Sequence, residues 1–249
     1  MNQQIGRGLL WKLLERFGVS GTQFVLQIIL ARLLDPAHYG VLSIMIIFTT
    51  LANVFVQNGF NTALIQNKDV TEEDYSSVLW VSLGISVLIY GAIFFGAPLV
   101  GAFYEMPDIV VPLRVLALML FPGALNSVQL AKVSREMDFK KVFYSNLGGI
   151  VVSGAVGIAM AYMGVGVWAL VCSYIVGQLV SAIYTKMMVK WKPQRLFSWK
   201  SVKEMFAFSS KVLVSSLFNT VYSDIRALLI GKVYTTETLA YYDRANLIR

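Results

Sequence analysis

Seven long apolar segments occupy most of the chain, and they limit its possible folds more than any other feature. They lie at residues 8–34, 40–66, 76–104, 109–131, 143–163, 166–189 and 204–232. Each is compatible with a tilted helix that crosses a bilayer, which needs about 20 mostly apolar residues. Only 14% of the 249 residues are charged, whereas soluble domains have about 25%. The sequence therefore predicts an all-α polytopic membrane protein with about seven transmembrane helices.

The Lys and Arg residues between these segments are distributed unevenly. Alternate loops hold Arg7 and Lys12, then Lys68, then basic residues at 132–141 and at 186–203. The opposite loops contain no Lys or Arg, and they lie at 35–40, 105–111 and 163–166. Because loops rich in Lys and Arg stay in the cytoplasm, we expect a cytoplasmic N-terminus. Topology also explains the net charge of +7, so no nucleic-acid partner is expected.

The first segment carries a polar stripe along one side of its predicted helix. At about 100° per residue, Arg16, Gln23 and Gln27 fall on one narrow face, because residues three or four apart share a side of a helix. A stripe of this kind facing lipid would cost several kcal/mol. We therefore expect it to face protein or a water-filled cavity, while Leu30 is expected to face lipid.

Two other segments also carry a polar stripe. Gln178, in the segment 166–189, belongs to none of the stripes. Asn53, Gln57 and Asn61 share a face of the second segment. In the seventh, Lys211, Asn219 and Arg226 share a face, with Asp224 on the other side. The stripes predict a hydrated cationic cavity whose candidate substrate-binding residues are Arg16, Gln23, Gln27, Asn53, Gln57, Asn61, Lys211, Asn219 and Arg226. The alternative is that these groups satisfy one another through hydrogen bonds between packed helices.

The chain also contains a weak internal repeat. The sequence around residue 34, at the end of the first segment, resembles that around residue 234, at the end of the seventh. Six helices separate the copies, and an even number gives both the same orientation, as in transporters with parallel repeats. We expect a six-helix bundle at 1–190, a basic cytoplasmic linker at 191–203, and the first helix and following loop of a second bundle at 204–249. The chain would then be part of a longer protein.

Residues typical of enzyme active sites are scarce. The chain has one histidine, His38, in a predicted loop, and one cysteine, Cys172, in an apolar segment. No cluster of His, Asp and Glu has the spacing of metal ligands, and no glycine-rich loop is typical of nucleotide binding. A nucleophile with an adjacent base is also absent from the sequence. The sequence predicts a protein that is not an enzyme and that needs no cofactor or metal.

Three stretches resemble a known family of transporters. LARLLDPAHYG at 30–40 and NGFNTALIQ at 58–66 are similar to the first hairpin of bacterial polysaccharide-biosynthesis flippases. YYDRA at 241–245 is similar to the stretch that follows that family's seventh helix. These flippases are the Wzx-like members of the multidrug/oligosaccharidyl-lipid/polysaccharide exporter superfamily. The resemblance runs over the whole chain, which covers about half of such a protein.

The resemblance implies two six-helix bundles related by a parallel repeat. It implies a transporter in the bacterial cytoplasmic (inner) membrane that moves undecaprenyl-pyrophosphate-linked oligosaccharide to the periplasmic leaflet, for O-antigen, capsule or exopolysaccharide biosynthesis. The implied partners are the lipid-linked oligosaccharide, membrane lipid and other polysaccharide-assembly proteins. A pyrophosphate requires cations and a glycan requires amides and hydroxyls, which agrees with the polar stripes.

Three alternatives stay open at this point. A cation-coupled multidrug exporter of the same superfamily should have unpaired carboxylates within the membrane, whereas two of the stripes are basic. A polytopic polysaccharide-assembly enzyme, such as a glycosyltransferase or polymerase, would need an acidic or histidine site that the sequence lacks. A membrane scaffold would use the stripes only for packing, so charge substitutions there would change its assembly but no flux.

Topology reporters fused in the loops test the predicted orientation. Because Lys and Arg are retained in the cytoplasm, reporters should indicate the cytoplasm at Thr71, Lys140 and Trp199. They should indicate the outside at Ala37, Asp108 and Gly164. A reversed pattern at Lys140 and Trp199, where basic residues are densest, would contradict the orientation.

Overall fold

The computed structural model describes residues 2–67, 69–136 and 138–246, without the side chains of 2–10, 58, 59, 208, 244 and 246. The helices are α1 (Asn2–Leu33), α2 (Pro36–Asn53), α3 (Gly59–Gln66), α4 (Glu72–Phe103), α5 (Val110–Leu116), α6 (Leu120–Glu136), α7 (Phe139–Tyr162), α8 (Val167–Val189), α9 (Trp199–Val233) and α10 (Thr236–Asn246). The described residues contain no strand, which agrees with the predicted all-α class. Some residues used in the sequence analysis lie outside the described part of the chain. They are Lys68, residue 249 at the end of the expected second bundle, and the side chain of Arg7.

Five stretches of the described residues are long and apolar enough to cross a membrane. They are Pro36–Gln66, Glu72–Phe103, Pro107–Glu136, Phe139–Tyr162 and Val167–Val189. These stretches correspond to the second to sixth predicted segments, so the prediction of a multi-pass membrane protein is confirmed. The first and seventh segments form α1 and α9, single helices of 32 and 35 residues that are not among the five. The count of seven spans stays a prediction.

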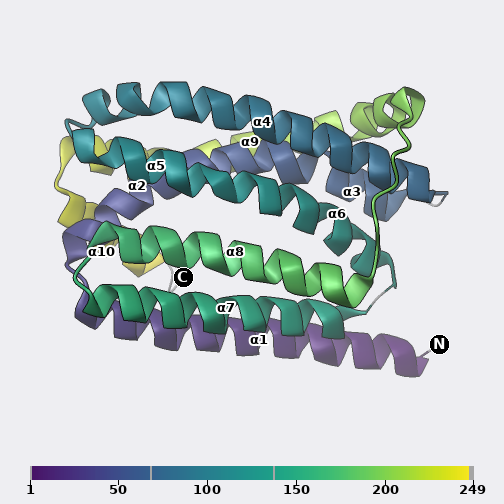
Figure 1. Cartoon of the computed structure of the whole chain (residues 1–249), viewed down its shortest axis with the longest axis horizontal. Helices are drawn as coiled ribbons and strands as arrows, with labels where there is room; N and C mark the ends of the chain where they lie inside the picture. Colours follow the sequence, from purple (N-terminus) through teal and green to yellow (C-terminus); the bar gives the residue numbers. More distant parts are fainter. Residues whose placement is uncertain (1, 68, 137, 247–249) are drawn as a thin grey trace.

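The helices lie side by side along the long axis of the molecule (Figure 1). The N-terminus, the turn between α3 and α4, and the connection from α8 to α9 lie at one end. We call this the basic end, because its loops carry most of the Lys and Arg residues. The α1–α2, α7–α8 and α9–α10 turns lie at the opposite end. α7 lies between α1 and α8 and packs along both of them.

Small residues allow α7 and α8 to pack at close range. A Cβ atom added at Gly149 would lie 2.9 Å from the carbonyl oxygen of Gly177, and one added at Gly157 would lie 3.1 Å from the hydroxyl of Ser173. The Ser173 hydroxyl donates to the carbonyl oxygen of Ser153 at 2.8 Å. Lipid tails are as apolar as leucine, so close contacts and hydrogen bonds of this kind hold membrane helices together.

The fourth predicted segment contains Pro122, which is expected to kink a helix. Proline lacks an N–H, and its ring crowds the carbonyl group four residues earlier, here that of Leu118. The structure has a 3-10 turn at Ala117–Met119, between α5 and α6. The expected disturbance is therefore present as a short break in the α-helix.

A π-helical turn interrupts the second predicted segment, and the sequence pattern did not predict it. This turn, η1, covers Val54–Asn58 and joins α2 to α3. π turns are wider than α turns and rare, and they often occur at functional sites. Because Gln57 lies within η1 and Asn61 after it, a wheel drawn with α-helical spacing does not give their true directions.

The α1–α2 and α9–α10 junctions have the same local structure. The helices end at Leu33 and Val233, and the next ones begin at Pro36 and Thr236. In both junctions the side chain of the preceding residue, Asp35 or Thr235, accepts a hydrogen bond from a backbone N–H of the helix that follows. The two junctions therefore have equal spacing, whereas the repeat and the boundaries of the bundles stay predictions.

The second junction also contacts α2 and the end of α4. α10 packs along α2, and a Cβ atom added at Gly40 would overlap the carbonyl group of Thr236. Lys232, near the end of α9, donates to the carbonyl oxygen of Phe103 at 2.6 Å and forms an ion pair with Glu105 at 3.0 Å. These contacts fix α9 and α10 against α2 and α4 at the end opposite the basic end.

Gly40→Ala is expected to weaken this contact. The added methyl group would overlap backbone atoms of Thr236, and overpacking of this kind costs about 1–3 kcal/mol. The thermal unfolding temperature of the protein in detergent micelles should fall by several degrees.

Gly84→Ala is the matched control, because nothing lies within 4 Å of a Cβ atom added there. It should leave the unfolding temperature unchanged or raise it slightly, since alanine is the better helix former. Unfolding of Gly40→Ala at the wild-type temperature would contradict the close contact between α2 and α10.

Candidate functional site

A cavity of about 840 Å³ lies between α1, α2, α7, α8, α9 and α10. Apolar residues such as Leu26 and Ile46 alternate on its walls with amides and hydroxyls. Its neutral polar residues are Gln23, Gln27, Ser43, Thr50, Asn146, Ser153, Ser173, Gln178, Ser181 and Ser223, with the tyrosines Tyr39, Tyr174 and Tyr242. The volume lies within the range of about 300–1,000 Å³ that is typical of ligand sites.

Among the described residues, the charged side chains that line the cavity come from α9 and α10. They are Asp224 and Arg226 on α9 and Asp243 on α10. Within the described lining residues there are thus two carboxylates and one guanidinium group, so the lining does not have the excess of cations that the sequence stripes predict. The walls formed by α1, α2, α7 and α8 are neutral among these residues.

The stripe on α1 reaches the cavity only in its second half. Gln23 and Gln27 line the cavity, as predicted. Arg16 is exposed and lies outside the lining, because it precedes Gln23 by two helical turns, roughly 10 Å along the axis. Glu15 pairs with Lys12 at 2.6 Å and accepts from the Asn146 amide at 3.1 Å. A helical wheel shows on which side of a helix a residue lies, but it does not show how far along the helix axis the residue lies.

The stripe on the second span divides into two parts. Ser43 and Thr50 line the cavity, whereas Asn53, Gln57 and Asn61 do not. The Gln57 amide donates to the side-chain oxygen of Asn53 at 2.9 Å. This bond joins residues four apart in one helical stretch, so it is local and differs from the hydrogen bonds between packed helices that the packing alternative requires. The side-chain oxygen of Asn61 is buried and has no hydrogen-bond partner among the described residues.

The amides of Asn53 and Gln57 meet that of Gln178 beside Gly123. A Cβ atom added at Gly123 would lie 2.9 Å from the Gln57 nitrogen, 3.3 Å from the Asn53 oxygen and 3.5 Å from the Gln178 nitrogen. Gln178 also lines the cavity. The absence of a side chain at Gly123 therefore leaves room for a polar cluster that adjoins the cavity wall.

On α9, only part of the predicted stripe reaches the cavity. Arg226 lines it, but Lys211 and Asn219 are exposed and lie outside the lining. Asp224, predicted on the other face, lines the cavity as well. The cavity residues of α9 run from 223 to 227 and include both faces, so the cavity covers nearly half of the helix circumference at this level.

Two further expectations are wrong, and several polar cavity residues were missed. Leu30 is only 7% exposed and lines the cavity, so it does not face lipid. Gln178 lies in the lining rather than away from the site. Asn146, Gln178 and Asp243 escaped prediction because none of them belongs to one of the three predicted stripes.

Comparison with known proteins identifies the family of the chain. The family described as "Polysaccharide biosynthesis protein" matches residues 29–248, which is most of the chain. The chain belongs to the polysaccharide biosynthesis protein family. This confirms the resemblance drawn from residues 30–40, 58–66 and 241–245. No solved structure matches the chain.

Three curated relatives match nearly the whole chain. TuaB of Bacillus subtilis, a teichuronic acid biosynthesis protein, is 26% identical over 251 residues. ExoT of Rhizobium meliloti, a succinoglycan biosynthesis transport protein, is 22% identical over 242 residues, and WzxC of Escherichia coli, a lipopolysaccharide biosynthesis protein, is 21% identical over 246 residues. The matches cover 98%, 97% and 96% of this chain, but 51%, 49% and 49% of the relatives. The chain therefore spans about half the length of these curated relatives.

Thiol labelling tests whether the cavity contains water. In a Cys172→Ala background, cysteines that replace Gln27 and Thr50 should react with a small charged thiol reagent, because both positions line the cavity and the reactive thiolate forms only in a polar environment. A cysteine that replaces Leu88, which is 75% exposed on the apolar helix α4, should react at least roughly tenfold more slowly in membranes. Equal labelling at all three positions, or none at Gln27 and Thr50, would contradict a hydrated cavity.

Proposed function

We propose that this chain forms the first bundle, and the start of the second, of a flippase in the bacterial cytoplasmic (inner) membrane. The flippase moves an undecaprenyl-pyrophosphate-linked oligosaccharide to the periplasmic leaflet for surface polysaccharide biosynthesis. The cavity between α1, α2, α7, α8, α9 and α10 carries this proposal. Its support is the family membership and the transport role that the name of ExoT states for that relative.

The cavity walls have the chemistry that such a substrate requires. Amides such as Gln23, Gln27 and Gln178 donate and accept hydrogen bonds, as the hydroxyl groups of a glycan do. Aromatic rings such as Tyr174 offer apolar faces to sugar rings. The polyprenyl chain stays in the lipid, where it needs no protein contact. The basic end then faces the cytoplasm, as the distribution of Lys and Arg predicts.

Arg226 is the proposed contact for the pyrophosphate. It lines the cavity, and its guanidinium carbon lies 5.9 Å from the centre of the Tyr222 ring. Among the described residues it has no ion pair within 4.0 Å. A guanidinium group binds phosphate oxygens through paired hydrogen bonds. The other proposed substrate contacts lie outside the lining and are assigned a smaller contribution: Arg16, Asn53, Gln57, Asn61, Lys211 and Asn219.

Arg226→Gln is expected to impair export of surface polysaccharide in a strain that depends on this protein. A hydrogen bond to a charged group contributes about 1.5–3 kcal/mol, so headgroup binding should weaken by roughly tenfold to a hundredfold. Arg226→Lys should be milder, because it keeps the charge and loses only the fork geometry. Surface polysaccharide is measured at equal membrane expression.

Arg32→Gln is the matched control, because it removes the same charge from an exposed position of α1 that does not line the cavity. It should leave export unchanged. Wild-type export by Arg226→Gln, or equal loss in both variants, would contradict the role of Arg226.

A cation-coupled multidrug exporter is the second candidate, and one observation favours it. Asp224 and Asp243 both line the cavity, and carboxylates inside a membrane protein are typical of ion and proton pathways. If this function holds, Asp224→Asn with Asp243→Asn should make an expressing strain more sensitive to cationic drugs while surface polysaccharide stays normal. Unchanged drug sensitivity in that double variant would exclude it.

A further inference from the structure

The connection between α8 and α9, residues 190–198, has no helical structure but is held firmly against the start of α4. The backbone N–H groups of Gln194 and Ser198 donate to the hydroxyls of Ser76 and Ser77 at 3.0 and 2.9 Å. Both of these serines are fully buried. The indole N–H of Trp80 donates to the carbonyl oxygen of Gln194 at 3.2 Å. The connection is thus attached to α4 through its backbone.

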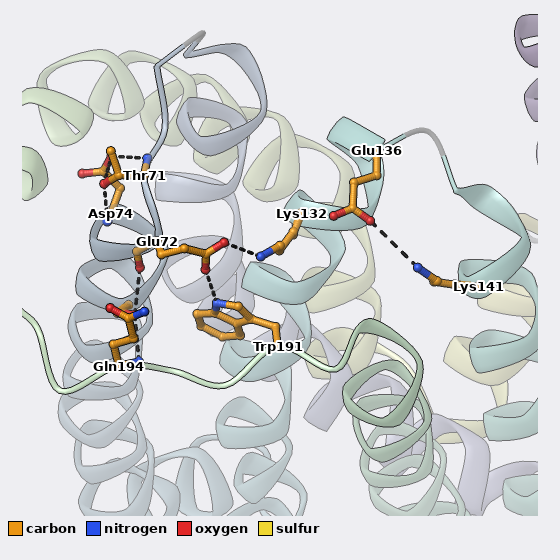
Figure 2. Close-up of polar contacts among 9 residues, drawn as sticks. Thr71, Glu72, Asp74, Lys132, Glu136, Lys141, Trp191 and Gln194 are labelled. Carbon is orange, nitrogen blue, oxygen red and sulfur yellow. Dashed lines mark hydrogen bonds and ion pairs between the residues drawn. The ribbon is translucent and has the colours of Figure 1, made fainter.

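One side chain of the connection strengthens this attachment. Trp191 is buried, and its indole N–H donates to one carboxylate oxygen of Glu72 at 2.7 Å. Lys132 of α6 binds the other oxygen of Glu72 at 2.5 Å. Figure 2 shows Trp191 and Gln194 lying over the first turns of α4, with Lys132 reaching Glu72 from the neighbouring helix. The backbone of the connection is attached to α4. Most of its other side chains are exposed on the side away from α4.

The outward side combines unpaired cations with large apolar side chains. Residues 190–204 contain five basic residues, Lys190, Lys192, Arg195, Lys200 and Lys203, and one acidic residue, Glu204. Among the described residues none of these five cations forms an ion pair. Between them, Phe197 is 51% and Trp199 is 68% exposed. In bulk water such exposed rings would be unfavourable.

The tryptophan positions are typical of a surface at the level of a membrane interface. Four of the five tryptophans belong to the first third of α1 or of α4, to the α8–α9 connection or to the start of α9: Trp11, Trp80, Trp191 and Trp199. These parts of the chain lie at the basic end (Figure 1). Tryptophan concentrates at the headgroup level of a bilayer, where its ring is in an apolar layer and its N–H is hydrated. Since Trp80 donates a hydrogen bond to Gln194, we expect the connection at the same depth.

From this arrangement we propose that residues 190–203 form a binding surface for anionic phospholipid headgroups of the bilayer. The cations bind phosphate groups, and Phe197 and Trp199 enter the interfacial layer between them. The attachment to Ser76 and Ser77 presents these side chains on a preformed surface, so little conformational entropy is lost on binding. The surface lies outside the cavity, and its lipid binding does not depend on the proposed transport function.

Lipid retention by the full chain tests this proposal. The protein is reconstituted in nanodiscs of phosphatidylcholine mixed with phosphatidylglycerol, and the lipids that it retains on release are counted by native mass spectrometry. The triple variant Lys192→Gln, Arg195→Gln, Lys200→Gln should lower the ratio of retained phosphatidylglycerol to phosphatidylcholine by at least about tenfold, because each basic residue near an anionic surface strengthens the attraction. Added salt should lower the wild-type ratio as well.

The matched control removes three charges from the same end of the molecule outside the connection. Lys12→Gln, Lys140→Gln, Lys141→Gln should change the ratio less than about twofold, because two of these lysines are engaged in ion pairs with Glu15 and Asp138 and ion pairing reduces their attraction for lipid phosphate. An unchanged ratio in the Lys192, Arg195, Lys200 variant would overturn the proposal. An equal loss in both triple variants would also overturn it, because it would indicate a general effect of net charge.

Discussion

Polar side chains that cannot face hydrocarbon determine how the helices of this protein are arranged. Lipid tails offer no hydrogen bonds to amides such as those of Gln23 and Gln27 on α1, so a position facing lipid would be unfavourable for these side chains. The fold turns this face of α1 inward, towards α2, α7 and α8. Small residues such as Gly149 and Gly177 then allow α7 and α8 to approach closely, so that the bundle closes around the polar faces. The polar faces of the helices point towards one another instead of towards lipid, and the cavity lies between these faces.

The position of α9 and α10 decides the charge of that cavity. The charged lining residues among those described, Asp224, Arg226 and Asp243, come from these two helices, whereas α1, α2, α7 and α8 contribute neutral polar groups. α10 reaches the cavity only because Gly40 lets it pack closely on α2. A movement of α9 and α10 against the other helices would therefore change the charges in the cavity, with little change in its neutral amides. This division fits the proposed substrate, which has a charged headgroup and a neutral glycan.

The sequence predicts the helices of this protein better than it predicts the cavity. The segment 143–163 corresponds to α7 and 166–189 to α8 within a few residues, because apolar runs bounded by polar loops mark helix ends clearly. The π turn at Val54–Asn58 has no such signal, and it changes the directions of the residues after it. Helical periodicity placed Gln23 and Gln27 correctly. It could not find isolated residues such as Asn146, since their role depends on which helices become neighbours.

Photo-crosslinking of the lipid-linked oligosaccharide in native membranes tests the central claim most directly. A photoreactive amino acid replaces Thr50, which lines the cavity, or Leu88, which is exposed on α4. After irradiation, antibodies against the surface glycan are used to detect oligosaccharide attached to the protein. A cavity that receives the glycan predicts an adduct at Thr50 and none at Leu88. Absence of an adduct at Thr50 in cells that actively export polysaccharide would contradict the account.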